Sequence, residues 1–198
     1  MLRVEGIVLS RLQYQDYDQI LTIFTLQEGL VKLICKQASR SKKGMNASTS
    51  PLTRAEFVYR LGKGEISRCD EVSVIQQYVA LRQRLDYLES ACDMLKALSQ
   101  SQMLGKPAPA LYALLSYYLE HLPLMQVPEV LALSFRLKIL RHEGILDLEE
   151  EGAKVFSPED LRWMHHFAYC QNFAELREIG LPVEGRLKCH HLFEMAYR

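Results

Sequence analysis

The sequence has no long apolar run and few cysteines. No stretch approaches the roughly 18 apolar residues that a bilayer crossing needs, and charged residues return too early in the N-terminus for a signal peptide. The five cysteines are an odd number without any C-x-x-C spacing, so they do not predict a disulfide framework. We therefore expect a cytoplasmic protein that does not bind a membrane.

The motifs of common enzyme classes are also absent. The chain contains no G-x-S-x-G, no P-loop and no Rossmann fingerprint. The sequence therefore predicts no enzyme, no catalytic residue and no cofactor.

Two expected helices carry residues that can bind zinc: His165, His166, Cys170, Cys189, His190 and His191. Their spacing does not match the C-x₂₋₄-C…H-x₃₋₅-H pattern, and a pair of packed helices needs no metal to fold. The sequence therefore favours core or capping roles for them and predicts no metal site.

Net charge is zero overall, but the charges are unevenly distributed. Residues 32–68 hold nine basic and two acidic residues, a net of +7, and the chain after residue 70 is net acidic. Such a division is typical of a basic module that binds a polyanion, joined to a neutral or acidic one.

The segment KQASRSKKGMNASTS (36–50) concentrates this charge. It carries Lys36, Arg40, Lys42 and Lys43 without an acidic residue, and its composition predicts a loop. Flexible cations beside a sheet can neutralise phosphates and release their counterions. The alternative is a solvated loop between strands with ordinary charged faces, and the residues alone leave both interpretations open.

The first part of the chain shows strand patterns. Branched apolar or alternating runs occupy 2–11, 19–26, 30–36 and 53–61, and a further strand is expected after the GKG turn at 62–64. Gly6 is expected at a bulge or bend, and Gly29 at a hairpin turn that needs a positive φ. Four or five short strands in some 75 residues predict a small closed or nearly closed barrel.

Alternation fixes the expected faces of the strand at 53–61. Ala55, Phe57 and Tyr59 share one face, opposite Arg54 and Arg60. The aromatic pair is therefore predicted to pack in the core and not to stack on bases.

After residue 80 the apolar residues recur at helical spacing. Helices are expected over 80–102, 110–122 and 129–144, from Ser157 with Pro158 and Asp160 behind it, and from about residue 184. The sequence thus predicts an α+β multidomain protein: a β-barrel domain over 1–79 and an all-helical domain over 80–198.

The order and spacing of several motifs resemble one known family. GIVLSRLQYQDYDQILTIFT (6–25), GLVKLICKQASRSKK (29–43) and SPLTRAEFVYRLGKGEISRCDEV (50–72) are similar to the N-terminal domain of RecO, the bacterial recombination mediators, and FRLKILRHEGILDL (135–148) is similar to a later RecO helix. Many relatives carry a four-cysteine zinc module after that helix. Here the stretch DLEEEGAKVFSPED (147–160) has no cysteine, so a short form without the module is expected.

The resemblance implies an oligonucleotide-binding (OB) barrel followed by helices, acting in DNA repair and recombination. It implies binding of single- and double-stranded DNA and annealing of complementary strands coated with single-stranded-DNA-binding protein (SSB). It also implies contact with the C-terminal tail of SSB, and cooperation with RecR in loading RecA. The chain is expected to act as a monomer.

The expected site residues are all basic. Those predicted to contact DNA phosphates are Lys36, Arg40, Lys42, Lys43, Arg54, Arg60, Lys63 and Arg68. Those predicted to rim the SSB-tail site are Arg136, Lys138 and Arg141. Two other functions would suit the same composition: an RNA- or ribosome-binding barrel module, and a helical protein-interaction scaffold whose basic segment serves solubility.

Overall fold

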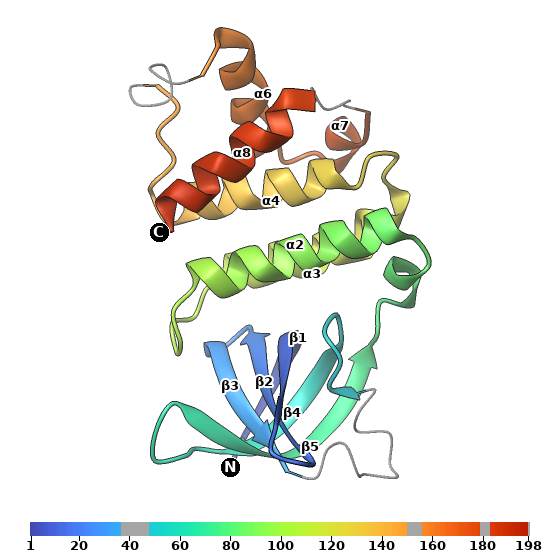
Figure 1. Cartoon of the computed structure of the whole chain (residues 1–198), viewed down its shortest axis with the longest axis vertical. Coiled ribbons are helices and arrows are strands. Elements are labelled where there is room, and N and C mark those ends of the chain that lie inside the picture. Colours follow the sequence, from blue (N-terminus) through green and yellow to red (C-terminus); the bar gives the residue numbers. More distant parts are fainter. Residues whose placement is uncertain (37–47, 150–155, 179–182, 198) are drawn as a thin grey trace. The chain divides into compact units, whose positions relative to one another are not determined.

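The chain forms two compact units (Figure 1). The computed structural model describes residues 1–36, 48–149, 156–178 and 183–197. The first unit contains Met1–Val79 and Gln102–Ser116, and the second contains Ala80–Ser101 and Tyr117–Arg198. The sequence assigned everything after residue 79 to the helical domain, so the grouping of Gln102–Ser116 with the barrel is a difference.

Five strands close into a barrel in the first unit: β1 (Leu2–Tyr14), β2 (Asp18–Thr25), β3 (Gly29–Cys35), β4 (Arg54–Arg60) and β5 (Ile66–Gln76). Around the barrel the order is β1-β2-β3-β5-β4, and β1 pairs with β4 to close it. Every pairing is antiparallel except that of β3 with β5. This is an OB fold, as predicted, followed along the chain by helices.

Alternating side chains fill the interior of the barrel. The core includes Val8, Leu21, Leu33, Phe57 and Tyr59, all at most 2% exposed. The predicted assignment of the two aromatic residues to the core is therefore confirmed. Because a buried ring cannot reach a base, the barrel must bind any ligand through other residues.

The strand irregularity in β1 lies beyond the predicted position. Gly6 pairs regularly with Thr25 and Ala55, and the register shifts only between Val8 and Ser10. A Cβ on Gly6 would lie 3.0 Å from Thr25 Cγ2 and 3.1 Å from the Phe24 carbonyl oxygen. Glycine at this position thus permits close strand approach, whereas a bulge was expected.

Gly29 begins β3 under two constraints. Its φ is +67°, as the hairpin predicted, and a Cβ there would lie 1.9 Å from the Lys106 carbonyl oxygen. The same loop pairs Leu104 with Leu30, and the Gly105 amide donates to the Leu30 carbonyl at 2.9 Å. These contacts explain why Gln102–Ser116 belongs to the barrel unit.

The helices described are η1 (Val79–Arg82), α2 (Leu85–Ser101), α3 (Pro109–His121), η2 (Leu122–Leu124), α4 (Glu129–His142), α6 (Pro158–Tyr169), α7 (Phe173–Glu178) and α8 (Val183–Ala196). In the second unit α4 packs against α2, α6, α7 and α8. Its buried residues occupy every side, which makes it the central helix of this unit.

Two predicted helix ends are confirmed. Ser157 caps α6, its side chain accepting from the Asp160 amide while Asp160 reaches back to the Ser157 amide. After α4, Gly144 has a φ of +72°, and the Ile145 amide donates to the Leu140 carbonyl.

Other helical features differ from the prediction. Leu85 and Cys92 follow the helical spacing of apolar residues in the first expected helix, which predicts them on its buried side, but both are exposed. The six-residue α7 was not predicted at all. In the part of the chain that the structure describes, no helix is both long and apolar enough to span a membrane.

Candidate nucleic-acid interface

One row of side chains crosses four strands on the outside of the barrel. Ile20 on β2 pairs with Ile34 on β3, and Ile34 pairs with Arg68 on β5. Arg68 in turn pairs with Arg60 on β4. Leu21 and the residues adjacent to Ile34, Arg68 and Arg60 face the core. Because successive side chains of a strand point to opposite faces, Ile20, Ile34, Arg68 and Arg60 face outward. We call Ile20, Ile34, Arg68 and Arg60 the outer row.

A second row runs beside it. Thr22 on β2 pairs with Lys32 on β3, and Lys32 pairs with Ile66 on β5. The Lys32 ammonium lies 3.8 Å from a Glu65 carboxylate oxygen, with both side chains more than a third exposed. Such a pair is weak enough for a phosphate to compete with it.

Asp70 holds the two arginines of the outer row. Arg60 donates from Nε to Oδ2 at 2.8 Å and from Nη2 to Oδ1 at 2.7 Å, and Arg68 Nε lies 3.8 Å from Oδ1. The hydrogen bonds from Arg60 lower the pKa of Asp70, so it is ionised at neutral pH. Two guanidinium groups, each more than half exposed, therefore share one carboxylate and keep a surplus positive charge.

Further exposed cations flank the outer row. Lys63 lies in the loop between β4 and β5, and Lys36 directly follows β3. OB folds bind oligonucleotides on the face of strands 2 and 3, assisted by the β1–β2 and β4–β5 loops. In this chain the β1–β2 turn brings exposed Tyr17, and the β4–β5 loop brings Lys63. The two rows and these loops together form a face of that kind.

Arg54 lies at the opposite end of β4 from Arg60, and its side chain binds other residues of the barrel unit. Its Nε and Nη2 each lie 2.7 Å from Glu5 Oε1, to which the Tyr112 hydroxyl also donates at 2.8 Å. Burial opposes ionisation of Glu5, but the hydrogen bonds from Arg54 and Tyr112 outweigh it and lower its pKa. Arg54 is thus part of a structural cluster, separated from Arg60 by roughly 20 Å of strand.

Three predicted phosphate contacts lie outside the described residues: Arg40, Lys42 and Lys43. Of the eight predicted residues, the structure brings Arg60, Lys63 and Arg68 together and leaves Lys36 exposed at the end of β3.

The three α4 cations predicted to rim an SSB-tail site are turned toward neighbouring helices. Arg136 is 6% exposed, with Nη1 2.8 Å from His190 Nδ1 and Nη2 3.3 Å from an Asp93 oxygen. Lys138 donates to the Cys170 carbonyl, and Arg141 donates to the Ala168 carbonyl. Because Arg136 is buried, it does not fit a surface rim.

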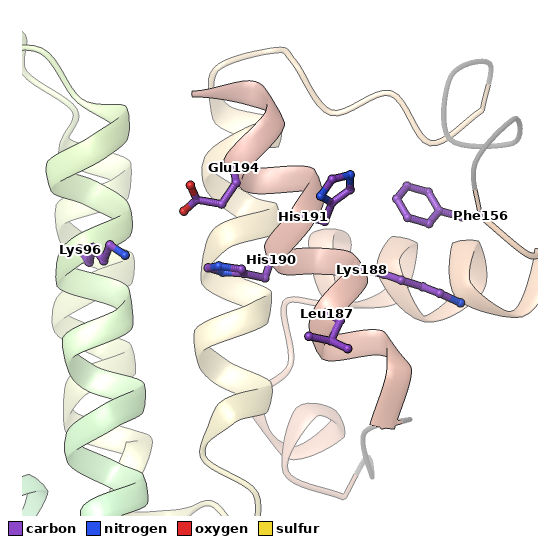
Figure 2. A pocket seen from close by; sticks show the side chains of 7 residues that line it. All are labelled: Lys96, Phe156, Leu187, Lys188, His190, His191 and Glu194. Atoms are coloured by element: carbon purple, nitrogen blue, oxygen red, sulfur yellow. The ribbon is translucent and has the colours of Figure 1, made fainter. Parts of the chain in front are cut away.

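A pocket of about 690 Å³ lies elsewhere in the helical unit (Figure 2). Lys96 of α2 lines one side, and α8 and Phe156 line the rest; the α8 residues are Leu187, Lys188, His190, His191 and Glu194. Figure 2 shows Leu187 and Lys188 on consecutive positions of α8, with Phe156 beside His191. The pocket thus combines two apolar side chains with two lysines, two histidines and one glutamate.

The histidines and cysteines that were expected in core or capping positions differ in burial, since Cys189 is buried whereas His165 and His190 are exposed. His190 contacts Arg136, and His165 stacks on Tyr169 with ring centroids 4.4 Å apart. His166 and Cys170 differ, because a carboxylate from α7 joins them.

Sequence reasoning missed part of the interface. Lys32 was counted in the basic window but not assigned to the site, and Ile20 and Ile34 were seen only as strand residues. The acidic partner Asp70 lies two residues beyond the basic window. An OB barrel places β3 beside β5. From this strand order, the sequence could have predicted that Lys32 and Ile34 lie next to the residues of β5.

Comparison with known proteins gives a consistent match. Residues 1–78 match the family described as recombination protein O N terminal. Among curated proteins, the chain is 28% identical over 145 residues to the DNA repair protein RecO of Chlamydia pneumoniae, covering 73% of this chain and 57% of that protein. It is 34% identical over 122 residues to RecO of Geobacter metallireducens, covering 61% and 49%.

A third relative extends the match. RecO of Pelobacter propionicus is 27% identical over 163 residues, covering 81% of this chain and 65% of that protein. The chain therefore spans about half to two thirds of the length of these relatives.

Proposed function

This chain belongs to the RecO family through its N-terminal OB domain, and from that premise we propose that it binds DNA in repair and recombination. It binds single and double strands, anneals complementary strands coated with SSB, and helps RecR load RecA. These activities are those that the resemblance implies for the family.

The observation that carries the proposal is the outer row with its flanking cations. Arg60, Arg68 and Lys32 lie on three adjacent strands, and Lys63 extends from the loop beside them. Within 60–68 there is no aromatic residue. A nucleic-acid backbone therefore meets positive charge and aliphatic side chains along the two rows, and Tyr17 of the β1–β2 turn adds an exposed aromatic ring beside them.

Annealing explains this chemistry. The protein must hold two polyanions close together while their base edges remain free to pair. Contacts to phosphates supply sequence-independent affinity through counterion release. Stacking of bases on aromatic side chains adds affinity too, but a stacked base is less free to find its partner.

The experiment compares two double variants with the same loss of charge. Arg60→Gln/Arg68→Gln removes both cations of the outer row, and Arg84→Gln/Arg162→Gln removes two exposed arginines of the helical unit. Binding of a fluorescent single-stranded oligonucleotide is measured over a range of salt concentrations. We expect the outer-row variant to flatten the slope of log K against log salt by about 1.4, from about 0.7 per phosphate contact.

The control variant is expected to keep the native slope, and annealing of SSB-coated oligonucleotides is expected to fail only in the outer-row variant. Equal slopes in all three proteins would contradict the proposed interface. Stronger retention of RNA than of DNA by the native chain would instead favour an RNA-binding module.

The pocket in Figure 2 is the better place for the tail of SSB. A hydrophobic tail with acidic residues needs an apolar groove rimmed by cations. Leu187 and Phe156 supply the apolar surface and Lys96 supplies positive charge, whereas the Lys188 ammonium is paired with Asp160 at 2.7 Å. The α4 cations meet this requirement less well, because Arg136 is buried.

A tail peptide tests this placement. Lys96→Glu and Leu187→Asp change exposed side chains and are expected to weaken peptide binding at least tenfold by fluorescence anisotropy. The control, Arg141→Glu, changes a cation outside the pocket and is expected to bind normally. Loss of peptide binding only in Arg141→Glu would indicate instead that the tail binds at α4.

A further inference from the structure

Three side chains of different chemistry meet where α6 gives way to α7. The His166 Nε2, the Cys170 Sγ and a Glu175 carboxylate oxygen all lie within 4.8 Å of one another. Cys170 Sγ is 3.4 Å from Glu175 Oε2, and His166 Nε2 is 3.9 Å from the same oxygen. We call His166, Cys170 and Glu175 the α6–α7 cluster.

The fold accounts for this convergence. His166 and Cys170 are four residues apart, so the last turn of α6 brings both to one side. The α7 helix is anchored on the other side, where Phe173 meets the rings of Tyr117 and His121 edge-on at centroid distances of 6.2 and 5.0 Å. Glu175 therefore lies on a helix that is held in place by packing.

One atom of the cluster lacks a hydrogen bond. Among the described residues, the His166 Nε2 has no hydrogen-bond partner, although that atom is buried. Buried ring nitrogens are normally satisfied, so an unpartnered one beside a thiol and a carboxylate needs an explanation. A metal ion bound to its lone pair supplies one.

We propose that the α6–α7 cluster binds a zinc ion through His166 Nε2, Cys170 Sγ and Glu175, with water in the fourth position. Imidazole, thiolate and carboxylate are the donors that zinc accepts. Around a tetrahedral zinc with bonds of 2.0–2.3 Å, the donor atoms would lie roughly 3.3–3.8 Å apart. The separations of 3.4 and 3.9 Å from the Glu175 oxygen lie at or near this range, and His166 and Cys170, whose donor atoms lie within 4.8 Å, would close on the ion.

The surrounding groups suit a bound cation. A thiolate and a carboxylate together carry two negative charges, which zinc balances. Asn172 donates to the other oxygen of Glu175 at 3.3 Å and so holds the carboxylate as an outer partner of the site. Lys138 donates to the carbonyl of Cys170, and the Cys170 thiol donates to the Asn172 carbonyl at 3.1 Å, a hydrogen bond that zinc would replace when the thiol ionises.

This donor set is separate from any cysteine-rich module. It contains one cysteine and lies beyond the cysteine-free stretch 147–160. Bound zinc would connect the end of α6 to α7 and so fix that corner of the helical unit. This role does not depend on DNA binding.

Cobalt is the probe for the experiment, because Co²⁺ occupies zinc sites and gives a visible spectrum and a thiolate charge-transfer band. The full chain is stripped of metal, titrated with Co²⁺ and then with Zn²⁺, which should displace the cobalt. We expect one equivalent of Co²⁺ with tetrahedral bands. Cys170→Ser should abolish the charge-transfer band, and Glu175→Gln should weaken binding at least tenfold.

Two controls match the residues changed. Cys92→Ser removes an exposed cysteine of α2, and His165→Gln removes the adjacent histidine of α6; both should bind cobalt normally. Circular dichroism checks the fold of Cys170→Ser, and Glu175 is exposed, so its variant tests the site without a core change. Absence of stoichiometric binding, or a charge-transfer band that survives in Cys170→Ser, overturns the proposal.

Discussion

Two arginines of β4, Arg54 and Arg60, each form an ion pair with a carboxylate, and the two pairs differ in how much positive charge stays exposed to solvent. Arg54 and Glu5 are partly buried, and Tyr112 completes their hydrogen bonds. The ion pair between Arg60 and Asp70 is equally short, but Arg60 is 54% exposed and Asp70 also pairs with Arg68. The pair whose arginine is mostly buried contributes to stability, whereas one carboxylate shared by two arginines that are more than half exposed leaves positive charge for a ligand.

The helical unit extends the comparison to Arg136, where the largest loss of stability is expected. Arg136→Ala removes a side chain that is 6% exposed, together with its contacts to His190 and Asp93, and opens a cavity beside α4. We expect the free energy of unfolding to fall by about 3 kcal/mol, measured by urea denaturation, with the salt slope of DNA binding unchanged. Arg162→Ala, at an exposed position, should cost less than about 0.5 kcal/mol. Equal losses in the two variants would refute the distinction.

A buried carboxylate provides the next test. The hydrogen bond from Lys188 outweighs burial and, with those from Ser157, lowers the pKa of Asp160 to about 2. Because the folded-state pKa lies below the unfolded value of about 3.9, the ionised group stabilises the fold above about pH 5 and loses this effect as pH falls toward 2. Asp160→Asn should therefore cost about 2 kcal/mol at pH 7 and almost nothing near pH 2. A cost independent of pH would contradict this assignment.

A smaller effect is expected at the enclosed pair of the barrel. Arg54→Gln should lower the free energy of unfolding by about 1–2 kcal/mol at pH 7, because Glu5 loses its charged partner. The lowered pKa of Glu5 means that this difference shrinks as pH falls through the acid range. The salt dependence of DNA binding should stay native; a flatter slope would instead place Arg54 in the interface.

The smallest effect on stability should accompany a gain in binding. Asp70→Asn removes the carboxylate that Arg60 and Arg68 share, and because both arginines are more than half exposed, the loss of stability should be smaller than that of Arg54→Gln. Two unneutralised guanidinium groups should then bind single-stranded DNA about fivefold more tightly at low salt, from about 1 kcal/mol for a charge pair in water. Glu71→Gln, one residue along β5, is the matched control and should change affinity less. Weaker binding by Asp70→Asn would show that Asp70 positions the arginines and does not compete for them.

Local patterns predicted most of the fold. Alternation located all five strands, including the core positions of Phe57 and Tyr59, and Ser157, Pro158 and Asp160 located the start of α6. Each of these signals lies within a few residues. The short α7 was missed because six residues are too few to show a helical period.

Long-range partners could not be predicted in the same way. The basic window counted Arg54 and Arg60 as equivalent cations, although Glu5, which engages Arg54, lies 49 residues earlier. The α6–α7 cluster likewise needed Glu175 from a helix that the sequence did not reveal. Charge counting finds a basic region, but pairing across the fold decides which cations remain exposed.

The parallel contact of β3 with β5 determines the order in which the barrel can assemble. It joins residues 32–35 to residues 66–69, and β1 joins β4 across a longer stretch of chain, from residues 2–7 to residues 54–59. During synthesis the β1–β2–β3 meander can form early, but both of its edges stay open until β4 and β5 emerge from the ribosome. Chains that stop before Ile66 should therefore expose strand edges and associate with one another, so closure of the barrel is a late event that protects the nascent protein.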